Sequence, residues 1–385
     1  MKKILFEPAW KLHSFHKEII DYPPEGYEFV VHNSLLGNIA QTAGKASMSY
    51  RLFLSIGNHV PLNLYRSYWG NLIRKTVGVD LIYACEHLIL EKKPWVVDTE
   101  YVSLLAGFNS KRFTRYKKTI EKALESSYCR KIICHTNAAK RSILLNLDRA
   151  KIEPKLEVVP LTTPRKEFVK RFNSDKIKIL FVGSSNILGE FTIKGGFETL
   201  EAFSLITKKY SNVELVIRSD LPKRIKEKYN NRNDIRIIDR LIPIEAMKQE
   251  FESADILLLP VHNTPYMSLL EAMSYELPVV TIDAWANSEI VENGKTGFLV
   301  PCSKNIPYYI ENSIPAFGTK EFERAIRTTD PEVVQGLCDK LSLLIENAEL
   351  RRNMGKAGRW EVEHGKFSIE KRNQHLKRIF DEATS

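Results

Sequence analysis

The chain has 385 residues, 57 of them lysine or arginine and 47 aspartate or glutamate, which gives a formal charge of +10. Hydrophobic residues make up 43% of the chain and charged residues 27%, the usage of an ordinary globular protein. This composition excludes a disordered tail protein, a collagen and a disulfide-rich miniprotein.

Length and charge both predict more than one domain. A chain of this length favours two domains of medium size. Residues 1–170 hold 27 basic and 16 acidic side chains, whereas residues 171–385 hold 30 and 31. The whole basic excess therefore lies in the first half, which indicates two modules with different partners.

Cysteine usage and apolar runs predict a cytosolic protein. The five cysteines are an odd number with no C-x-x-C pair, typical of reduced thiols. No apolar run approaches the roughly 18–20 residues of a membrane helix, and we expect no secretory signal at the N-terminus.

In the first half, short apolar runs alternate with helix-length segments, the pattern of an α/β parallel sheet. We expect a helix at 111–126, helix and loop over 40–75, and strands at 3–6, 27–32, 79–83, 95–98 and 131–135. The polar, basic and proline-punctuated stretch that begins at Pro160 predicts a linker.

After the linker the same alternation restarts more clearly and predicts a doubly wound sheet with right-handed crossovers. The expected strands are 177–183, 213–218, 235–238, 256–260 and 279–283, the last ending the series. The expected helices are 196–209, 221–230, 244–252 and 269–275, followed by a helical tail over 331–383 with breaks near 355–358 and 365.

Ligands of open α/β sheets bind beyond the carboxyl ends of strands, so the residues after each strand are candidate site residues. Gly183 ends the first strand of the second half, and Lys194 with Gly195 precedes the next helix. Glycines, a helix N-terminus and a lysine together suit a phosphate, although turn glycines and a solvated lysine give the same pattern. The absence of G-x-G-x-x-G and G-x-x-x-x-G-K-[ST] disfavours dehydrogenases and P-loop NTPases.

The residues of a second loop suggest a binding site for a ribose. We place Glu271 in the first turn of the helix that follows the strand at 256–260. A carboxylate there is stabilised by the helix dipole and can accept hydrogen bonds from vicinal hydroxyls. A surface or capping glutamate is the structural alternative.

These pieces occur in a recognisable order. FVG…KGG…EAF is followed by ADILLLP…SLLEAM…LPVV, then by SEIVENGKTGFLV and ELRRNMGKAGRW. The order resembles that of the retaining glycosyltransferases of family four. The resemblance implies a GT-B fold, with two Rossmann-like doubly wound domains facing a cleft that holds the active site, and a nucleotide-diphosphate sugar as co-substrate without a metal cofactor.

The resemblance also implies a division of labour. Residues 1–165 would form the acceptor-binding domain, on which the C-terminal helix at about 366–385 packs, and residues 175–365 would form the donor-binding domain. Lys194 matches the lysine that contacts the diphosphate, and Glu271 matches the second glutamate of the E-x7-E motif, which holds the ribose.

Three positions depart from the family pattern. Asn263 replaces the first glutamate of that motif, Tyr266 replaces a glycine that often approaches the donor sugar, and Ser184 replaces an arginine of the phosphate loop. Arg218 or Arg240 would supply the missing cation, unless they are ordinary surface arginines. The predicted donor-binding set is Gly183, Ser184, Lys194, Gly195, Arg218, Arg240, His262, Tyr266, Leu270 and Glu271.

The acceptor side is predicted from the strand KPWVVDTEY. Aligned on its proline, Glu100 occupies the place of a histidine that the family commonly carries. Glu100 and Asp98 are therefore the predicted catalytic residues, which would orient or deprotonate an acceptor hydroxyl. A structural role for Asp98 stays open.

The stretch 111–131 carries eight basic and two acidic residues. Phe113, Tyr116, Ile120 and Leu124 recur at helical spacing, so this helix either faces the core with a solvated basic face or lies on an anionic membrane. No nucleic-acid recognition motif is present. The predicted membrane or acceptor surface comprises Lys111, Arg112, Arg115, Lys117 and Lys118.

Together these features predict a retaining transferase that moves a hexose from a nucleotide-diphosphate sugar to a saccharide or lipid-linked acceptor, in the cytoplasm or at the inner face of the cell membrane. His13 and His16 have helical metal-ligand spacing, but no further ligands surround them, and we expect no metal site. A non-catalytic nucleotide-sugar-binding or scaffold protein and a nucleotide-sugar epimerase of the same fold stay open as alternatives.

Overall fold

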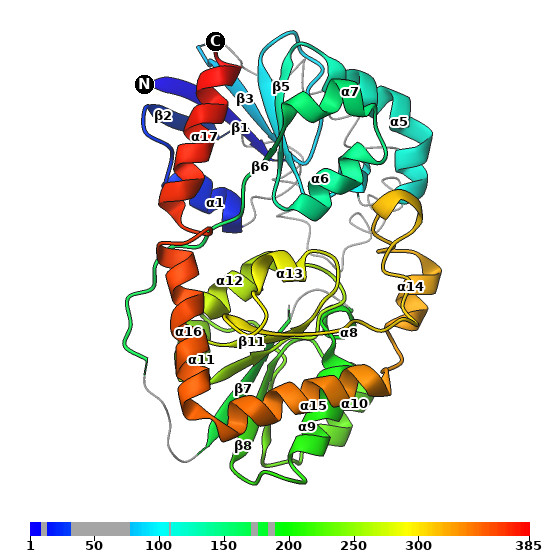
Figure 1. Ribbon diagram of the computed structural model, residues 1–385, viewed down its shortest axis with the longest axis vertical. Helices are drawn as coiled ribbons and strands as arrows, with labels where there is room; N and C mark the ends of the chain where they lie inside the picture. The colour runs from blue at the N-terminus through cyan, green and yellow to red at the C-terminus, as the bar shows by residue number, and fades with distance from the viewer. Residues whose placement is uncertain (9–13, 32–77, 108, 171–175, 184–188) are drawn as a thin grey trace. The chain divides into compact units, whose positions relative to one another are not determined.

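The computed structural model describes residues 1–8, 14–31, 78–107, 109–170, 176–183 and 189–385, which form two compact units (Figure 1). Unit 1 comprises Met1–Leu161, Tyr309–Gly318 and Ile369–Ser385. Unit 2 comprises Thr162–Tyr308 and Thr319–Ser368. The expected helix and loop over 40–75, as well as Ser184 and His13, lie outside the described residues.

Unit 1 contains an all-parallel sheet with the strand order β2-β1-β3-β4-β5-β6. All five strands expected here are confirmed, and a sixth that the sequence did not predict, β6, is too short and too polar to stand out. The strands are β1 Lys2–Pro8, β2 Tyr27–Val31, β3 Leu81–Cys85, β4 Trp95–Thr99, β5 Cys129–Cys134 and β6 Leu156–Val158.

Helices cover both faces of this sheet, which explains why every residue of its central strands β3 and β4 is buried. Side chains of α5 and α6 pack on one face, and those of α1 and α17 pack on the other. The helices are α1 Ser14–Asp21, α5 Ser110–Glu125, α6 Asn137–Leu144, α7 Arg149–Ile152 and α17 Ile369–Ala383.

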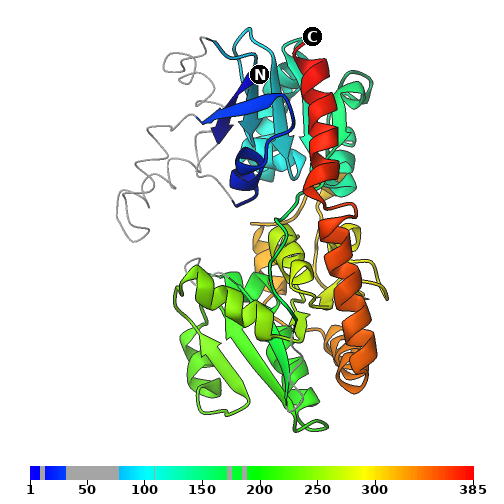
Figure 2. The same ribbon diagram turned by 90° about the vertical axis from the view of Figure 1, so that its left-hand side faces the viewer.

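The final helix, α17, belongs to unit 1, as the resemblance implied (Figure 2). Its buried Arg372 pairs with Glu18 of α1, with 2.5 Å between Nη1 and Oε2. The Tyr27 hydroxyl donates to Asp381 over 2.7 Å, and its ring meets Phe380 edge-on at 5.2 Å. A buried ion pair and apolar packing therefore fasten the C-terminal helix to the first sheet.

Unit 2 contains a second all-parallel sheet, in the order β12-β11-β10-β7-β8-β9. Read from β9 this is the doubly wound order 3-2-1-4-5-6. The strands are β7 Ile177–Val182, β8 Val213–Arg218, β9 Ile235–Ile238, β10 Ile256–Leu258, β11 Val279–Ile282 and β12 Gly297–Val300. The predicted α/β class with two doubly wound sheets is thus confirmed.

Two sequence predictions for unit 2 are wrong. The series does not end at β11, because β12 follows it. Its first residue, Gly297, lies where a Cβ atom would be 2.1 Å from the Val279 carbonyl oxygen. The helix α16 is not broken near Gly355 and Gly358, where a side chain at 355 would lie 2.2 Å from the Glu276 carbonyl oxygen. These glycines allow close approach rather than ending elements.

The break at Gly365 is confirmed, since it falls between α16 and α17. The helices of unit 2 are α8 Glu190–Ile193, α9 Gly196–Ile206, α10 Lys223–Tyr229, α11 Ile244–Ser253, α12 Tyr266–Ser274, α13 Asn287–Ile290, α14 Lys320–Ala325, α15 Pro331–Glu346 and α16 Ala348–Glu363.

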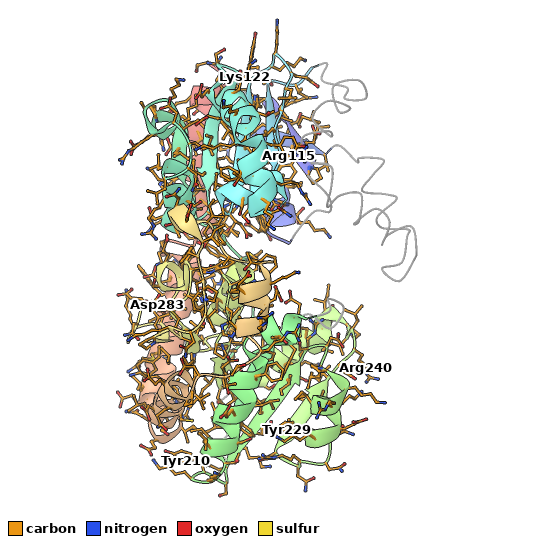
Figure 3. All side chains as sticks on the ribbon, turned by 90° about the vertical axis from the view of Figure 1, so that its right-hand side faces the viewer. Arg115, Lys122, Tyr210, Tyr229, Arg240 and Asp283 are labelled. Atoms are coloured by element: carbon orange, nitrogen blue, oxygen red, sulfur yellow. The ribbon has the colours of Figure 1, made fainter. Side chains whose placement is uncertain are left out.

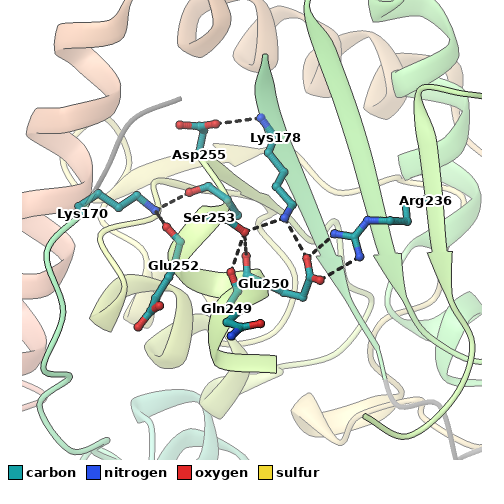
Figure 4. Close-up of polar contacts among 9 residues, drawn as sticks. Lys170, Lys178, Arg236, Gln249, Glu250, Glu252, Ser253 and Asp255 are labelled. Carbon is teal, nitrogen blue, oxygen red and sulfur yellow. Dashed lines mark hydrogen bonds and ion pairs between the residues drawn. The ribbon is translucent and has the colours of Figure 1, made fainter. Parts of the chain in front are cut away.

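The amino-terminal edge of the second sheet is held by a polar network (Figure 4). The Lys178 ammonium lies 2.9 Å from Glu250 and donates to Ser253 over 2.6 Å. Glu250 also accepts two hydrogen bonds from Arg236, at 2.9 and 2.5 Å. Its pKa is lowered: burial opposes ionisation, but the bonds from Arg236 and Lys178 outweigh it. Every charge there has a partner, which indicates a structural role for this edge.

Candidate functional site

The strand order of the second sheet places a candidate site between β7 and β10. Strands β8 and β9 continue on one side of this pair, and β11 and β12 continue on the other. The loops that follow β7 and β10 therefore diverge, which opens a crevice at the carboxyl ends of the strands where ligands of such sheets bind.

Arg218, at the end of β8, reaches the loop after β7. The Gly183 amide donates to the Arg218 carbonyl over 2.7 Å, and the Arg218 guanidinium donates back to the Gly183 carbonyl over 2.6 Å. A Cβ atom at Gly183 would lie 2.5 Å from Ser219 Oγ, so a larger residue would displace the Ser219 hydroxyl. Burial lowers the pKa of Arg218, and its Nε finds no hydrogen-bond partner among the described residues.

Lys194 and Gly195 form the entry to α9. Gly195 has a left-handed φ of 77°, and a Cβ atom there would lie 2.1 Å from the carbonyl oxygen of Pro260, in the loop after β10. Glycine is therefore needed for both conformation and contact. The Lys194 ammonium, 11% exposed, lies 3.9 Å from a Glu190 carboxylate oxygen. The structure thus places Gly195 of the predicted phosphate loop against the loop after β10.

Both the side chain and the backbone amide of His262 contact other groups of the protein. Its side chain is buried, with Nδ1 lying 3.0 Å from the Tyr308 hydroxyl and Nε2 lying 3.2 Å from a Glu198 carboxylate oxygen. Its backbone amide donates to the Ile193 carbonyl over 2.9 Å. His262 therefore joins the loop after β10 to the entry of α9, so that it orders the crevice rather than reaching openly into it.

The remaining residues of this loop differ in exposure. Tyr266 and Leu270 are buried, and the Tyr266 ring lies edge-on to Phe367 at 6.1 Å. The Asn263 side-chain oxygen is buried and has no hydrogen-bond partner among the described residues. A buried acceptor without a donor is unusual and marks a position where a ligand or water would bind.

Glu271 lies in the second turn of α12, and the predicted first-turn position is wrong. The helix begins at Tyr266, directly after Pro265, three residues earlier than the apolar pattern indicated. The helix dipole weakens beyond the first turn, so it is not what stabilises this carboxylate. Instead the Lys166 ammonium lies 3.0 Å from Oε1 and the Thr163 hydroxyl donates to Oε2 over 3.2 Å, which leaves the side chain 30% exposed.

Arg240 is not brought to the crevice. It follows β9, the edge strand, which β8 separates from β7. Its side chain is exposed (Figure 3). Of the two arginines proposed to replace the missing cation, only Arg218 contacts a residue of the loop after β7.

In unit 1 the described strand order changes direction between β1 and β3. Two buried ionisable residues meet there: His87 Nε2, after β3, lies 3.4 Å from a carboxylate oxygen of Glu7, near the end of β1. The other ring nitrogen of His87 lies 2.9 Å from the Cys85 carbonyl oxygen. The carboxyl edge of the first sheet is thus filled with charged groups rather than with glycine.

Asp98 is the centre of this edge and is fully buried. One carboxylate oxygen accepts from the Tyr83 hydroxyl over 3.2 Å, and the other accepts from the Glu86 amide over 3.0 Å. His16 Nε2 lies 3.3 Å away and His135 Nε2 lies 3.8 Å away. Burial opposes ionisation, but the hydrogen bond from His16 and the two histidine charges hold the pKa of Asp98 below its usual value.

The same cluster contains three potential metal ligands. One potential ligand atom from each of His16, Cys85 and Asp98 lies within 4.8 Å of the others. Both oxygens of Asp98 already accept hydrogen bonds from protein donors, Tyr83 and the Glu86 amide. This arrangement favours a hydrogen-bonded acid–histidine cluster, in which Asp98 positions its neighbours instead of meeting a substrate.

Glu100 and Glu86 are the half-buried carboxyl groups beside this cluster. Glu100 follows β4, as predicted. Glu86 follows β3 in a left-handed conformation with φ of 63°. Burial, and then the charges of Glu100 and Asp98, raise the pKa of Glu86 well above its usual value. Nothing in the spacing of the sequence singles out Glu86, because its position depends on this backbone conformation.

The basic helix α5 has the predicted apolar face, and that face is part of the core. Phe113, Ile120 and Leu124 are buried, and Tyr116 packs beside them. The opposite face is charged and solvated (Figure 3). Arg112 is half-buried, and Lys111, Arg115, Lys117 and Lys118 are exposed.

Comparison with known proteins finds a family match for part of the chain. Residues 176–310, which contain the loops after β7 and β10, match the family model described as “Glycosyl transferases group 1”. The match covers less than half of the chain, so the similarity is that of this segment. No curated protein sequence matches the chain.

Solved structures with a similar fold are glycosyltransferases. HepE from Anabaena in complex with UDP has a TM-score of 0.62 at 13% identity, over 99% of this chain and 100% of that chain. A glycosyltransferase from Rickettsia africae has a TM-score of 0.60 at 13% identity, over 99% and 98%. These similarities establish the GT-B fold with its two Rossmann-like domains.

A third similar structure is TarM from S. aureus, with a TM-score of 0.58 at 16% identity. The match covers 82% of this chain and 58% of TarM, so this chain spans little more than half the length of TarM. Its complex contains UDP, fondaparinux and α-GlcNAc-glycerol.

Proposed function

We propose that the protein transfers a hexose from a nucleotide-diphosphate sugar to a saccharide or lipid-linked acceptor, with retention of the anomeric configuration. Lys194 neutralises the diphosphate leaving group, and Arg218 adds a second cation at the same crevice. Glu271 accepts hydrogen bonds from the ribose hydroxyls. Glu100 orients the acceptor hydroxyl, and no metal takes part.

One observation carries this proposal: the segment matched to the glycosyltransferase family contains both loops of the switch point in the second sheet. Gly195 lies against Pro260, so the two loops meet, and the Asn263 side-chain oxygen has no hydrogen-bond partner among the described residues. Cations and backbone amides at a helix entry suit a diphosphate. An unsatisfied acceptor suits the hydroxyl groups of the transferred sugar.

Uridine donors are the first to test. The structures of HepE and TarM that resemble this chain contain UDP, and one HepE complex also contains glucose. Donor turnover should be measured as release of nucleotide diphosphate from uridine, guanosine and adenosine diphosphate sugars, with and without glycan or lipid acceptors.

The same assay separates the alternatives. Release that depends on the acceptor supports transfer, and the anomeric configuration of the product tests retention. Nucleotide binding without turnover would indicate a non-catalytic binding or scaffold protein. A rearranged sugar released without any acceptor would indicate an epimerase.

We further propose that the basic face of α5 brings unit 1 to an anionic membrane surface from the cytoplasmic side. Lys111, Arg115, Lys117 and Lys118 are exposed on that face, and each such charge adds roughly 1 kcal/mol of attraction to an anionic bilayer. Among the residues that the structure describes, no helix is long and apolar enough to cross a membrane.

Cosedimentation with vesicles tests this second proposal. Binding to vesicles that contain anionic lipid should fall as salt rises, and replacement of Lys117 and Lys118 by glutamine should weaken it about 30-fold, if each contributes roughly 1 kcal/mol. Replacing Lys223 and Lys228 of α10 in unit 2 is the matched control. Equal losses from both pairs would contradict a specific role of α5.

A further inference from the structure

Glu86 occupies the point in the first sheet where a ligand is expected. It is the first residue after β3, and β3 borders the change of direction in the described strand order. Its φ of 63° is in the left-handed region, which costs free energy for any residue with a side chain. Such strain in a non-glycine residue at a strand end is a recognised mark of a functional position.

Two of the other non-glycine residues with left-handed backbone use their side chains in contacts within the protein. Glu276, with φ of 55°, pairs with Arg359 over 3.0 Å. Trp285, with φ of 52°, donates from its indole nitrogen to the Tyr308 carbonyl over 3.1 Å. The Glu86 carboxyl group, in contrast, makes no hydrogen bond or ion pair to another described residue. A glycine would satisfy the backbone at position 86 without strain.

The buried cluster fixes the backbone of Glu86. Its amide donates to the Asp98 carboxylate over 3.0 Å and to the Asp98 carbonyl over 3.2 Å. Asp98 is itself held by Tyr83 and faces His16. The cluster therefore holds Glu86 by its main-chain amide, and the Glu86 side chain is available to another partner.

The strand register brings a second carboxyl group to the same edge. Cys85 pairs with Asp98 at the ends of β3 and β4, so Glu86 and Glu100 both lie just beyond that pair. The negative charge of Glu100 acts on Glu86. Two half-buried carboxyl groups at one strand edge suit a ligand with hydroxyl groups, which both donate and accept hydrogen bonds.

We propose that Glu86 is an acceptor-binding residue that forms a hydrogen bond with a hydroxyl group of the sugar acceptor beside Glu100. The inference rests on the proposed transferase function and adds a residue to its acceptor side. Because the environment favours the protonated form of Glu86, its carboxyl group donates to the hydroxyl oxygen. A carboxyl oxygen of Glu100 accepts the hydroxyl hydrogen, so one alcohol is held from both sides.

Steady-state kinetics of the full chain test this inference, with the donor and the acceptor varied separately. Glu86→Ala and Glu86→Gly should raise the acceptor KM at least tenfold and leave the donor KM within twofold. Glu86→Gln, which keeps a hydrogen-bond donor of the same size, should stay within about threefold of the wild type. Glu86→Gly should unfold at a temperature equal to or above that of Glu86→Ala, since glycine suits the left-handed conformation.

The control is Glu276→Gly, which also removes a left-handed glutamate but takes away an ion pair in unit 2. It should lower the unfolding temperature and leave the acceptor KM unchanged. A wild-type acceptor KM in both Glu86→Ala and Glu86→Gly overturns the inference while donor turnover by the wild type upholds the transferase function. Absence of turnover in the wild type removes the transferase function and this inference with it.

Discussion

The two sheets are both all-parallel, but their carboxyl edges differ in chemistry. In unit 2 that edge is built from glycines and cations, with Gly195 pressed against Pro260 and Arg218 bonded to Gly183. In unit 1 it is built from buried carboxylates and histidines around Asp98. Two parallel sheets in one chain therefore offer two kinds of binding edge.

The difference follows from what each ligand requires. A diphosphate needs backbone amides that can approach it closely and cations that balance its charge, which favours glycine and lysine. A hydroxyl acceptor needs groups that exchange hydrogen bonds with an alcohol, which favours carboxyl groups. The proposed division into a donor unit and an acceptor unit is consistent with this contrast.

The largest expected effect tests whether the charged edge of unit 1 depends on its central carboxylate. Asp98→Ala should lower the free energy of unfolding by about 3–5 kcal/mol, because it leaves buried donors and two histidines without their anion. Denaturant unfolding measures the change. Asp148→Ala, which removes an exposed helix cap of α7, is the control in the same unit and should cost about 1 kcal/mol. Equal losses would show that Asp98 is no more than an ordinary polar residue.

The corresponding test in unit 2 is Gly195→Ala. The substitution adds strain at φ of 77° and a clash with Pro260, so it should destabilise the unit by about 2–4 kcal/mol and abolish nucleotide binding. Gly189→Ala is a matched control, because Gly189 has φ of 84° but nothing within 4 Å of the added atom. It should cost only about 1–2 kcal/mol, since left-handed strain remains without the clash. If the two variants behave alike, the contact with Pro260 does not shape the donor edge.

A smaller effect is expected from the ribose contact. Glu271→Gln keeps the size of the side chain but removes the charge, and it should weaken nucleotide binding about tenfold, or about 1.4 kcal/mol. Isothermal titration calorimetry with uridine diphosphate would measure it. Glu245→Gln, exposed in the first turn of α11, is the control and should bind like the wild type. Unchanged affinity in Glu271→Gln would remove this residue from the donor site.

The sequence predicted those parts of the fold and site that depend on local pattern. Strands such as β8 appear as mostly apolar runs because both sheet faces are covered, and the predicted range of β8 is confirmed. Gly183 and Lys194 were found because they follow or precede elements that the pattern defines. Whether they bind a nucleotide stays a prediction.

The missed features depend on contacts between segments distant in the sequence. The start of α12 could not be read from an apolar pattern, because Tyr266 turns inward against Phe367, a residue a hundred positions away. Glu86 was missed because its position is set by its φ angle and by the register of β3 with β4. Local periodicity carries neither kind of information.

The smallest expected effect is a pH dependence of stability that comes from a histidine at the carboxyl edge of the first sheet. Burial, opposed by the charge of Asp98, lowers the pKa of His135 below its ordinary value near 6.5, so the unfolded chain binds a proton that the folded chain releases. Stability should therefore fall as pH drops below about 6.5, the ordinary pKa of histidine. His135→Asn cannot titrate at this position, so urea unfolding of the variant should show a smaller decline, and the difference between the two curves cancels the groups that do not interact with His135. Below about pH 4 both should lose further stability, since the lowered pKa of Asp98 means that its contribution is lost only as that carboxylate is protonated. A pH-independent difference between wild type and variant would show that the histidine is not held neutral in the acceptor edge.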